Sequence, residues 1–184
     1  MSHTDHIRIY IFGASGTGTT TLGENIATEL GLVHVDCDDH YWAPVEPPFS
    51  IKRTPEDRVV SMRSALGHKG WVLTGACNGW GRELIDQAQL IVFATLPTQD
   101  RLQRLRAREK ARFGGRIEEG GDMFQIHRDL MRWAAGYDDP TFSGRNIAIH
   151  EKWLAEQSKH ICRIDATRRP QEAMEKVIRE LSES

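Results

Sequence analysis

Long apolar runs, closely spaced cysteines and an excess of charge of either sign are all missing from this sequence. No apolar run approaches the roughly 18–20 residues that a helix needs to cross a bilayer, so we expect no membrane partner. The N-terminus lacks the charged and apolar regions of a signal peptide, which favours a cytoplasmic protein. The formal net charge of -2 gives no overall attraction to nucleic acid, which we do not expect as a partner.

Cysteine is scarce, and its spacing excludes two kinds of site. The three cysteines, Cys37, Cys77 and Cys162, show neither metal-ligand spacing nor the spacing of a redox motif. A cytoplasmic compartment keeps thiols reduced, so we interpret them as buried or half-buried free thiols. The eight histidines are scattered, and the sequence therefore predicts no zinc site.

What the sequence does contain is an alternation of apolar runs with helical patterns. Its 184 residues suffice for one well-packed α/β domain, and no linker, repeat or low-complexity stretch divides residues 1–184. The strand-like apolar runs cover residues 7–12, 32–35, 71–74, 90–96 and 160–164. Helical patterns lie between them, and this alternation predicts a parallel sheet covered by helices on both faces.

Three helices are predicted from their starts or from their apolar stripes. Thr54 is a predicted N-cap, Pro55 is the first helical residue, and Asp57 lies near the acidic position of a capping box. The apolar stripe of this helix is formed by Val59, Met62 and Leu66. A second stripe, of Met123, Ile126, Leu130 and Trp133, predicts a helix near residues 123–133. The final helix starts near Pro170, and its stripe is formed by Ala173, Val177 and Leu181.

The glycine-rich segment after the first apolar run is the most informative motif. It reads Gly13-Ala14-Ser15-Gly16-Thr17-Gly18-Thr19-Thr20-Thr21 and leads into a helix-like run. A strand, a glycine-rich turn and a helix together form a loop that surrounds phosphate with backbone N–H groups and with the positive end of the helix dipole. Thr20 stands where the motif's hydroxyl coordinates Mg²⁺, and Thr21 adds a hydroxyl donor. The alternative is a tight turn without a ligand.

One defining residue of the phosphate-loop motif Gly-x-x-x-x-Gly-Lys-Ser/Thr is absent, because Thr19 stands in the position of the lysine. That lysine normally places a cation between the β- and γ-phosphates, and one charged hydrogen bond is worth about 1.5–3 kcal/mol. Its loss weakens nucleotide binding or turnover about ten- to a hundredfold unless another cation compensates.

Two aspartates directly follow the second predicted strand. The carboxyl ends of the strands face the ligand site of an open α/β sheet, so Asp36 and Asp38 both point to that side only if the strand gives way to a turn there. One carboxylate can then hold Mg²⁺, and the other can accept a proton from a substrate hydroxyl. A solvated acidic turn that caps the next element is the alternative.

Two further loops follow predicted strands. In segment 74–81, Gly75 and Ala76 allow a substrate to approach the backbone, and Trp80 can stack on a flat group. After the fifth strand, Thr167 lies in a loop that can border a nucleotide base. A plain glycine-rich turn and a capped turn are the respective alternatives.

A run of arginines predicts a lid. Four arginines recur at offsets of three, four and four, which places them on one face of a helix, namely Arg101, Arg104, Arg108 and Arg112. Arg116 follows among glycines. An arginine-bearing helix that runs into a glycine-rich loop, over about residues 108–125, is typical of a lid that closes over phosphates and brings cations to them. For the first two arginines a solvated charged face is an equal alternative, whereas for the last two and Arg116 we favour the lid.

Together these motifs resemble the nucleoside-monophosphate-kinase-like family of P-loop kinases, which includes adenylate, shikimate and gluconate kinases. The resemblance covers nearly the whole chain and rests on four features: the phosphate loop, the Asp36-Cys37-Asp38 segment, the arginine-rich helix after Leu96-Pro97, and the Ile164-Asp165-Ala166-Thr167 segment. It implies the three-layer α/β P-loop NTPase fold, with a five-stranded parallel sheet in the order 2-3-1-4-5 and an arginine-rich lid. It also implies ATP and Mg²⁺ as cofactors.

Within this family, Asp36-x-Asp38 and Thr74-Gly75-Ala76 are most similar to shikimate-kinase-type members. That similarity implies that the two aspartates serve Mg²⁺ and substrate, with Asp36 and Thr20 as the metal pair. It also implies that the segment after the third strand lines the acceptor site.

The resulting hypothesis is an ATP-dependent phosphotransferase, a monomer or small homo-oligomer, that acts on a nucleoside monophosphate or a small hydroxy metabolite. Residues 13–21 and Thr167 bind the nucleotide, and Asp38 orients or deprotonates the acceptor. The residues that close over the transferring group are Arg108, Arg112 and Arg116. Thr19 motivates the alternative, which is a nucleotide-binding module or a slow ATPase without a phosphoryl acceptor.

Overall fold

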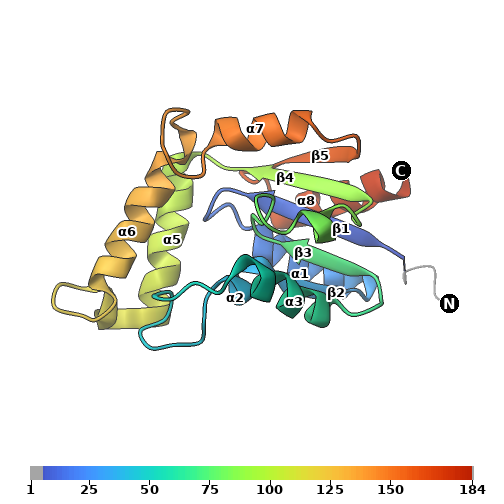
Figure 1. Cartoon of the computed structure of the whole chain (residues 1–184). Helices are drawn as coiled ribbons and strands as arrows, with labels where there is room; N and C mark the ends of the chain where they lie inside the picture. Colours follow the sequence, from blue (N-terminus) through green and yellow to red (C-terminus); the bar gives the residue numbers. More distant parts are fainter. Residues whose placement is uncertain (1–5, 184) are drawn as a thin grey trace.

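The computed structural model describes residues 6–183, and the five strands in this part of the chain form one parallel sheet (Figure 1). The strands are β1 (Arg8–Gly13), β2 (Val33–Asp36), β3 (Trp71–Thr74), β4 (Leu90–Thr95) and β5 (His160–Asp165). They lie in the order β2-β3-β1-β4-β5, so the predicted three-layer α/β class and strand order are confirmed. Each predicted strand end lies within one residue of the observed end.

Helices cover both faces of this sheet. They are α1 (Thr19–Leu30), α2 (Cys37–Tyr41), α3 (Pro55–Leu66), α4 (Arg82–Ile85), α5 (Thr98–Phe113), α6 (Phe124–Ala135), α7 (Ile147–Ala155) and α8 (Pro170–Ser182), with the 3-10 helices η1 (Gly114–Ile117) and η2 (Gly136–Asp138). Helices α3, α4 and α7 pack on one face, and α1 and α8 pack on the other.

Alternate residues of the central strand serve the two faces. Tyr10 and Phe12 lie in the cluster under α3, α4 and α7, whereas Ile9 and Ile11 lie in the cluster under α1 and α8. All four side chains are fully buried. Because both faces are covered, β1 reads as a continuous apolar run rather than as an alternating one. Burial of one isoleucine or phenylalanine side chain stabilises the fold by about 1.5–3 kcal/mol.

The start of α3 follows the predicted capping pattern. The Thr54 hydroxyl accepts a hydrogen bond from the backbone N–H of Asp57 at 3.1 Å and donates one to the Asp57 carboxylate at 2.8 Å. Pro55 is the first helical residue, where its missing N–H costs nothing because that group has no partner inside the helix. Met62 and Leu66 are buried, and Val59 packs partly against the same cluster. The predicted N-cap and apolar stripe are therefore confirmed.

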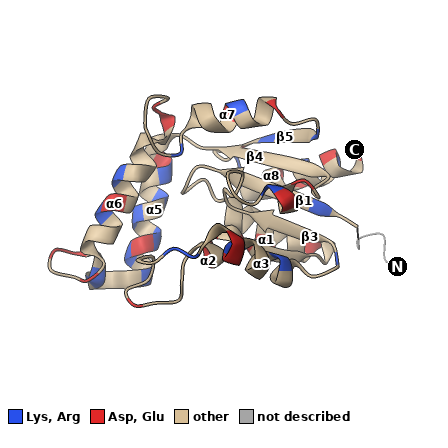
Figure 2. Cartoon of the chain, in the orientation of Figure 1, with Lys and Arg blue, Asp and Glu red and all other residues tan. Residues whose placement is uncertain are grey.

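Helices α5 and α6 form an arm, residues 98–135, that stands to one side of the sheet (Figure 1). Helix α5 begins soon after β4 ends, which places the arm at the carboxyl edge of the sheet. Charged residues are frequent along both helices of the arm (Figure 2). Of the predicted lid segment, Arg108 and Arg112 belong to α5, and Arg116 belongs to η1.

Helix α7 is not among the elements that the sequence predicts. It is short, and its inward residues, among them His150 and Leu154, are separated by polar or exposed ones. Trp153 and Leu154 pack on the sheet face that carries Tyr10 and Phe12. Within residues 6–183, no helix combines the length and the apolar character that crossing a membrane requires.

The capping bond of α3 predicts a measurable loss of stability. Thr54→Ala should lower the free energy of unfolding by about 1 kcal/mol, because it removes the hydroxyl that accepts from Asp57. Urea denaturation followed by circular dichroism measures this change. Thr28→Ala is the matched control, since the Thr28 hydroxyl bonds to the Glu24 carbonyl inside α1 and alanine is the better helix former there. An equal loss in both variants would contradict a specific capping role.

Candidate active site

Of the predicted phosphate-binding segment 13–21, residues 14–18 form the loop that connects β1 to α1 and is called the phosphate loop below. Gly16 and Gly18 have φ angles of +85° and +96°, a backbone conformation that residues with side chains disfavour. A Cβ atom at Gly16 would also lie 2.5 Å from the carbonyl oxygen of Arg101. Helix α1 begins at Thr19, and no side chain caps its first N–H groups. The loop therefore presents backbone donors and the positive end of a helix dipole at one place, which favours an anion.

Thr17 stabilises the turn of the loop by hydrogen bonds inside the loop. Its side chain is buried, and both its backbone N–H and its hydroxyl donate to the carbonyl of Ala14. Thr19 and Thr20 are half-buried, and Thr21 is exposed. The turn is tight, as both the phosphate-loop prediction and its alternative require, and it leaves the first N–H groups of α1 without a side-chain cap.

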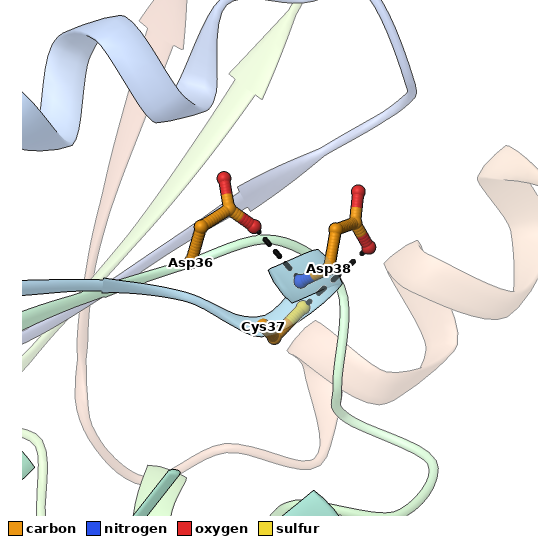
Figure 3. A group of neighbouring side chains, drawn as sticks. All are labelled: Asp36, Cys37 and Asp38. Carbon is orange, nitrogen blue, oxygen red and sulfur yellow. Dashed lines mark hydrogen bonds between the residues drawn. The ribbon is translucent and has the colours of Figure 1, made fainter. Parts of the chain in front are cut away.

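A hydrogen bond joins the phosphate loop to the acidic end of β2. The Thr20 hydroxyl donates to Asp36 Oδ2 at 2.6 Å, and Asp36 Oδ1 accepts from the backbone N–H of Asp38 at 2.9 Å. Figure 3 shows the Asp36 and Asp38 carboxylates side by side and pointing the same way. Strand β2 ends at Asp36 and α2 begins at Cys37, so the chain turns at the point that the sequence argument required. Asp36 is also the N-cap of α2, so the capping alternative holds as well.

Gly75 allows this close approach of two strand ends. Its φ angle is +90°, and a Cβ atom there would lie 2.4 Å from Cys37 Sγ and 3.1 Å from Asp36 Oδ1. Cys37, Cys77 and Cys162 are buried free thiols, as predicted. A hydrogen bond with Cys77, followed by burial, raises the pKa of the Cys37 thiol. Cys37 is therefore a protonated packing residue rather than a thiolate ligand or nucleophile.

Asp38 sits in a mixed electrostatic environment. Although the residue is exposed at the surface, crowding by the surrounding chain desolvates the Asp38 carboxyl and, followed by the negative charge of Asp36, raises its pKa, whereas the positive charges of Arg145 and Arg108 oppose this shift. Arg145 is a residue that the sequence analysis missed. Its guanidinium donates to the Ala76 carbonyl at 3.1 Å and lies 5.3 Å from the Trp133 ring. The signal in the sequence is weak, because Arg145 stands alone in an irregular segment before the N-cap of α7.

The three favoured lid arginines separate into two groups. Arg108 lies within electrostatic reach of Asp38 and is bonded to the buried carboxylate of Glu109. Arg112 instead stacks near the Phe49 and Phe113 rings, each at 5.1 Å from its guanidinium.

Arg116 binds two carboxylates at the far end of the arm. It pairs with Glu46, in the segment between α2 and α3, and donates to Asp122 at 2.9 and 2.7 Å. Together with Arg112 it connects the far end of the arm to the segment around residues 46–49.

The first two arginines of α5 contact the phosphate loop. Arg101 is fully buried and donates to the Ser15 carbonyl at 3.4 Å, so the solvated-face alternative is wrong for Arg101. Arg104 donates to the carbonyls of Thr17 and Ala166, each at 3.3 Å, although its side chain remains exposed. Both residues belong to the surroundings of the loop rather than to a free helix surface.

Arg58 is the second residue that the sequence analysis missed. Its guanidinium carbon lies 3.7 Å from the centre of the Tyr41 ring and 5.2 Å from that of Trp80. The side chain is only 7% exposed, and its Nε has no hydrogen-bond partner among the described residues. Arg58 precedes Met62 and Leu66 at spacings of four, so a charged residue in the apolar stripe of α3 is the available signal. The predicted stacking partner Trp80 thus faces a cation of the chain itself.

The remaining predicted residues lie at the carboxyl ends of β3 and β5. Ala76 is buried, and its carbonyl is the one bound by Arg145. Thr167 forms a capped turn in which its N–H and hydroxyl both donate to Asp165. Thr167 and Ala14 of the phosphate loop line one recess of about 430 Å³. The recess thus connects the phosphate loop to the loop after β5.

Comparison with known proteins identifies a relative by sequence and solved structures that share the fold. No protein-family model matches the chain. A gluconokinase from Sinorhizobium meliloti 1021 matches with a TM-score of 0.51 at 16% identity, over 97% of this chain and 93% of that one. An uncharacterized protein from Eubacterium ventriosum ATCC 27560 matches with a TM-score of 0.53 at 12% identity, over 97% and 99% of the two chains. At these identities the likeness shows a shared fold alone.

Sequence similarity identifies a family directly. The uncharacterized protein YqaC of Bacillus subtilis (strain 168) is 35% identical over 175 residues, which cover 95% of this chain and 97% of the relative. Identity at this level over nearly the full length of both proteins is a relationship of descent and not only of fold. The chain belongs to the same family as YqaC of Bacillus subtilis.

Proposed function

We propose that this protein is an ATP-dependent phosphotransferase whose acceptor is a small molecule with an anionic group, either a nucleoside monophosphate or a small hydroxy metabolite. The observation that carries the proposal is the 2.6 Å contact between Thr20 and Asp36. It joins a phosphate-type loop to a pair of carboxylates, as a phosphoryl-transfer site requires. The gluconokinase among the structures of the same fold supports a kinase activity.

The residues at this contact fit a magnesium ion. The Thr20 hydroxyl and the Asp36 carboxylate are oxygen donors, the ligand type that Mg²⁺ prefers. Mg²⁺ bound there would neutralise charge on the β- and γ-phosphates. The loop's own contribution is its row of backbone N–H groups, which bind and orient phosphate oxygens without a lysine. Cys37 is excluded from this donor set by its burial and its protonated thiol.

Asp38 is the proposed base. Its carboxylate lies beside that of Asp36 and points the same way (Figure 3). The raised pKa makes the Asp38 carboxylate a better proton acceptor than an ordinary aspartate near neutral pH. Arg145 and Arg108 bring positive charge to the same place, where negative charge spreads over the transferring group. Arg112 and Arg116 act at the far end of the arm, where they keep it against the segment around residues 46–49.

Arg58 supports an anionic acceptor. The guanidinium is nearly buried, it rests on Tyr41 and Trp80, and no described carboxylate forms an ion pair with it. A charge that is removed from water without a counter-charge is costly. A phosphate or carboxylate group of the acceptor would remove that cost, and Gly75, Ala76 and Trp80 would border it.

Thr19 favours a second candidate, a nucleotide-binding module or slow ATPase without an acceptor. A loop that lacks its lysine binds phosphate through backbone groups yet supplies no cation from the loop itself to the transferring group. The two candidates differ in whether ADP release depends on an acceptor.

An acceptor panel separates the two candidates. ADP release from Mg²⁺-ATP is measured with nucleoside monophosphates, with small hydroxy acids and with uncharged polyols. We expect release that depends on an anionic acceptor, and weaker or no release with the polyols. Release that is the same with and without every acceptor supports the slow ATPase, and ATP binding without any release supports the binding module.

The role of Asp38 predicts a kinetic effect with a pH signature. Asp38→Asn should lower kcat about 10²- to 10⁴-fold, because the amide cannot accept the acceptor's proton. In the unchanged protein, the rate should fall as pH drops through the raised pKa of Asp38, above the ordinary aspartate range of about 3.9. Asp39→Asn, at the next position of α2, where the residue is exposed as Asp38 is, is the matched control and should retain activity. Equal activity of both variants would exclude Asp38 as the base.

The missing lysine predicts the response to its restoration. Thr19→Lys should tighten ATP binding about ten- to a hundredfold, because it adds one charged hydrogen bond to the phosphates. Isothermal titration calorimetry measures the Kd for ATP. Thr28→Lys adds the same charge to the exposed side of α1 and should leave the affinity nearly unchanged. Loss of binding in Thr19→Lys would instead mean that the loop accepts only a hydroxyl at this position.

A further inference from the structure

Two arginines of α5 contact the phosphate loop through its carbonyl oxygens. Arg101 Nη1 donates to the carbonyl of Ser15 at 3.4 Å, and Arg104 Nη1 donates to the carbonyl of Thr17 at 3.3 Å. Gly16 lies directly against α5, since a Cβ atom there would lie 2.5 Å from the Arg101 carbonyl oxygen and 3.0 Å from Leu105 Cγ. The loop therefore packs on the first turns of the helix that begins the arm.

These contacts determine where the loop's N–H groups point. In a planar trans peptide the C=O and N–H groups point in opposite directions. The Ser15 carbonyl shares its peptide with the N–H of Gly16, and the Thr17 carbonyl shares its peptide with the N–H of Gly18. Because α5 binds both carbonyls, both N–H groups point away from α5. Gly16 and Gly18 have the positive φ angles that such an alternating, anion-binding turn requires.

Arg101 is suited to hold this arrangement because all of its donors are used. Its Nε donates to the Leu96 carbonyl at 3.1 Å. Nη1 donates to Ser15 and, at 3.2 Å, to the Ala134 carbonyl at the end of α6. Nη2 donates to Thr98 Oγ1 at 2.8 Å and to Asp138 Oδ2 at 3.2 Å. A guanidinium has five N–H donors, and these bonds match them one for one in a side chain that is fully buried.

Arg101 also brings positive charge to a loop that has no lysine. Its ionic partner, Asp138, has a side chain that is 51% exposed, so solvent screens that carboxylate more than it screens the buried guanidinium. Arg104 adds a second cation whose Nη1 lies 3.6 Å from where a Cβ of Gly18 would be. Both cations come from the arm and not from the loop.

We propose that Arg101 is a positioning residue that holds the phosphate loop in its anion-binding conformation and, with Arg104, supplies the positive charge that Thr19 does not. The inference rests on the proposed function for its nucleotide, but the conformation of the loop can be tested without a ligand. In this proposal anion binding depends on the arm, because the Arg101 guanidinium binds both the Ala134 carbonyl at the end of α6 and the Ser15 carbonyl in the loop.

The test compares Arg101→Lys with Arg106→Met. Lysine keeps the charge but cannot bind five acceptors, whereas Arg106 is exposed on the same helix and serves as the matched control. For Arg101→Lys we expect the Kd for ATP to rise about tenfold or more, with kcat at saturating ATP changed less than about threefold. Hydrogen exchange of the amides in residues 14–18 should be faster than in the unchanged protein, while the amides of β1 and β4 keep their protection. Arg106→Met should change none of these quantities.

The opposite result would overturn the inference. If folded Arg101→Lys binds ATP with unchanged affinity and its loop amides exchange at the unchanged rate, the loop does not depend on Arg101. If the protein binds no ATP at all, the proposed function fails, and the hydrogen-exchange comparison still decides the role of Arg101.

Arg104→Met tests whether α5 supplies positive charge to the phosphate loop. This second variant also keeps the proposal testable if Arg101→Lys does not fold. Arg104→Met, at an exposed side chain, should weaken ATP binding severalfold at low salt and less at high salt. Thr19→Lys should restore the affinity of Arg104→Met, since it returns a cation to the loop. Unchanged affinity of Arg104→Met at low salt would refute the contribution of α5 to the charge of the site.

Discussion

Backbone pairing sets Thr74 of β3 beside Asp36 of β2 on one side and beside Ile11 of β1 on the other. Because the three strands are parallel, the phosphate loop, the two aspartates and Gly75 all emerge at one edge of the sheet. A register shift of one residue would turn Asp36 to the opposite face and separate it from Thr20. The 2.6 Å bond between Thr20 and Asp36 is therefore a consequence of the sheet register, and the rest of the site is arranged around it.

In the proposed site, positive charge comes from residues outside the phosphate loop, most of them on the arm. In a loop with its lysine, the cation moves with the backbone that binds the phosphates. Here Arg101 and Arg104 of α5 bind carbonyls of the loop, and the positive charges of Arg145 and Arg108 act on Asp38. A displacement of α5 would change both the conformation of the loop and the potential at the phosphates. The arm and the loop are thus coupled by direct contacts, although they are far apart in the sequence.

The parts of the fold that the sequence predicted came from local patterns and from the family resemblance. The strand order came with the family resemblance, and the cap at Thr54 followed from three neighbouring residues. The family resemblance paired Thr20 with Asp36 as metal ligands, and the structure joins the two side chains by a hydrogen bond. Arg58 and Arg145 were missed because their contacts are tertiary: one rests on rings from α2 and the loop after β3, and the other binds a carbonyl 69 positions away. The burial of Arg101 was equally invisible, since helical spacing describes a face but not what covers it.

Arg58 shows how an unfavourable environment narrows the chemistry of a site. Cation–π contact with Tyr41 and Trp80 is worth about 0.5–2 kcal/mol, whereas an effective penalty for removing an ion from water amounts to several kcal/mol. The buried Nε without a hydrogen-bond partner adds to that penalty. A fold selected for stability alone would place methionine or leucine at this position of the α3 stripe, as it does at Met62 and Leu66. Keeping an arginine there is favourable when an anionic group binds beside it. The electrostatic imbalance at Arg58 is therefore a stronger argument for an anionic acceptor than the fold, which kinases with chemically different acceptors share.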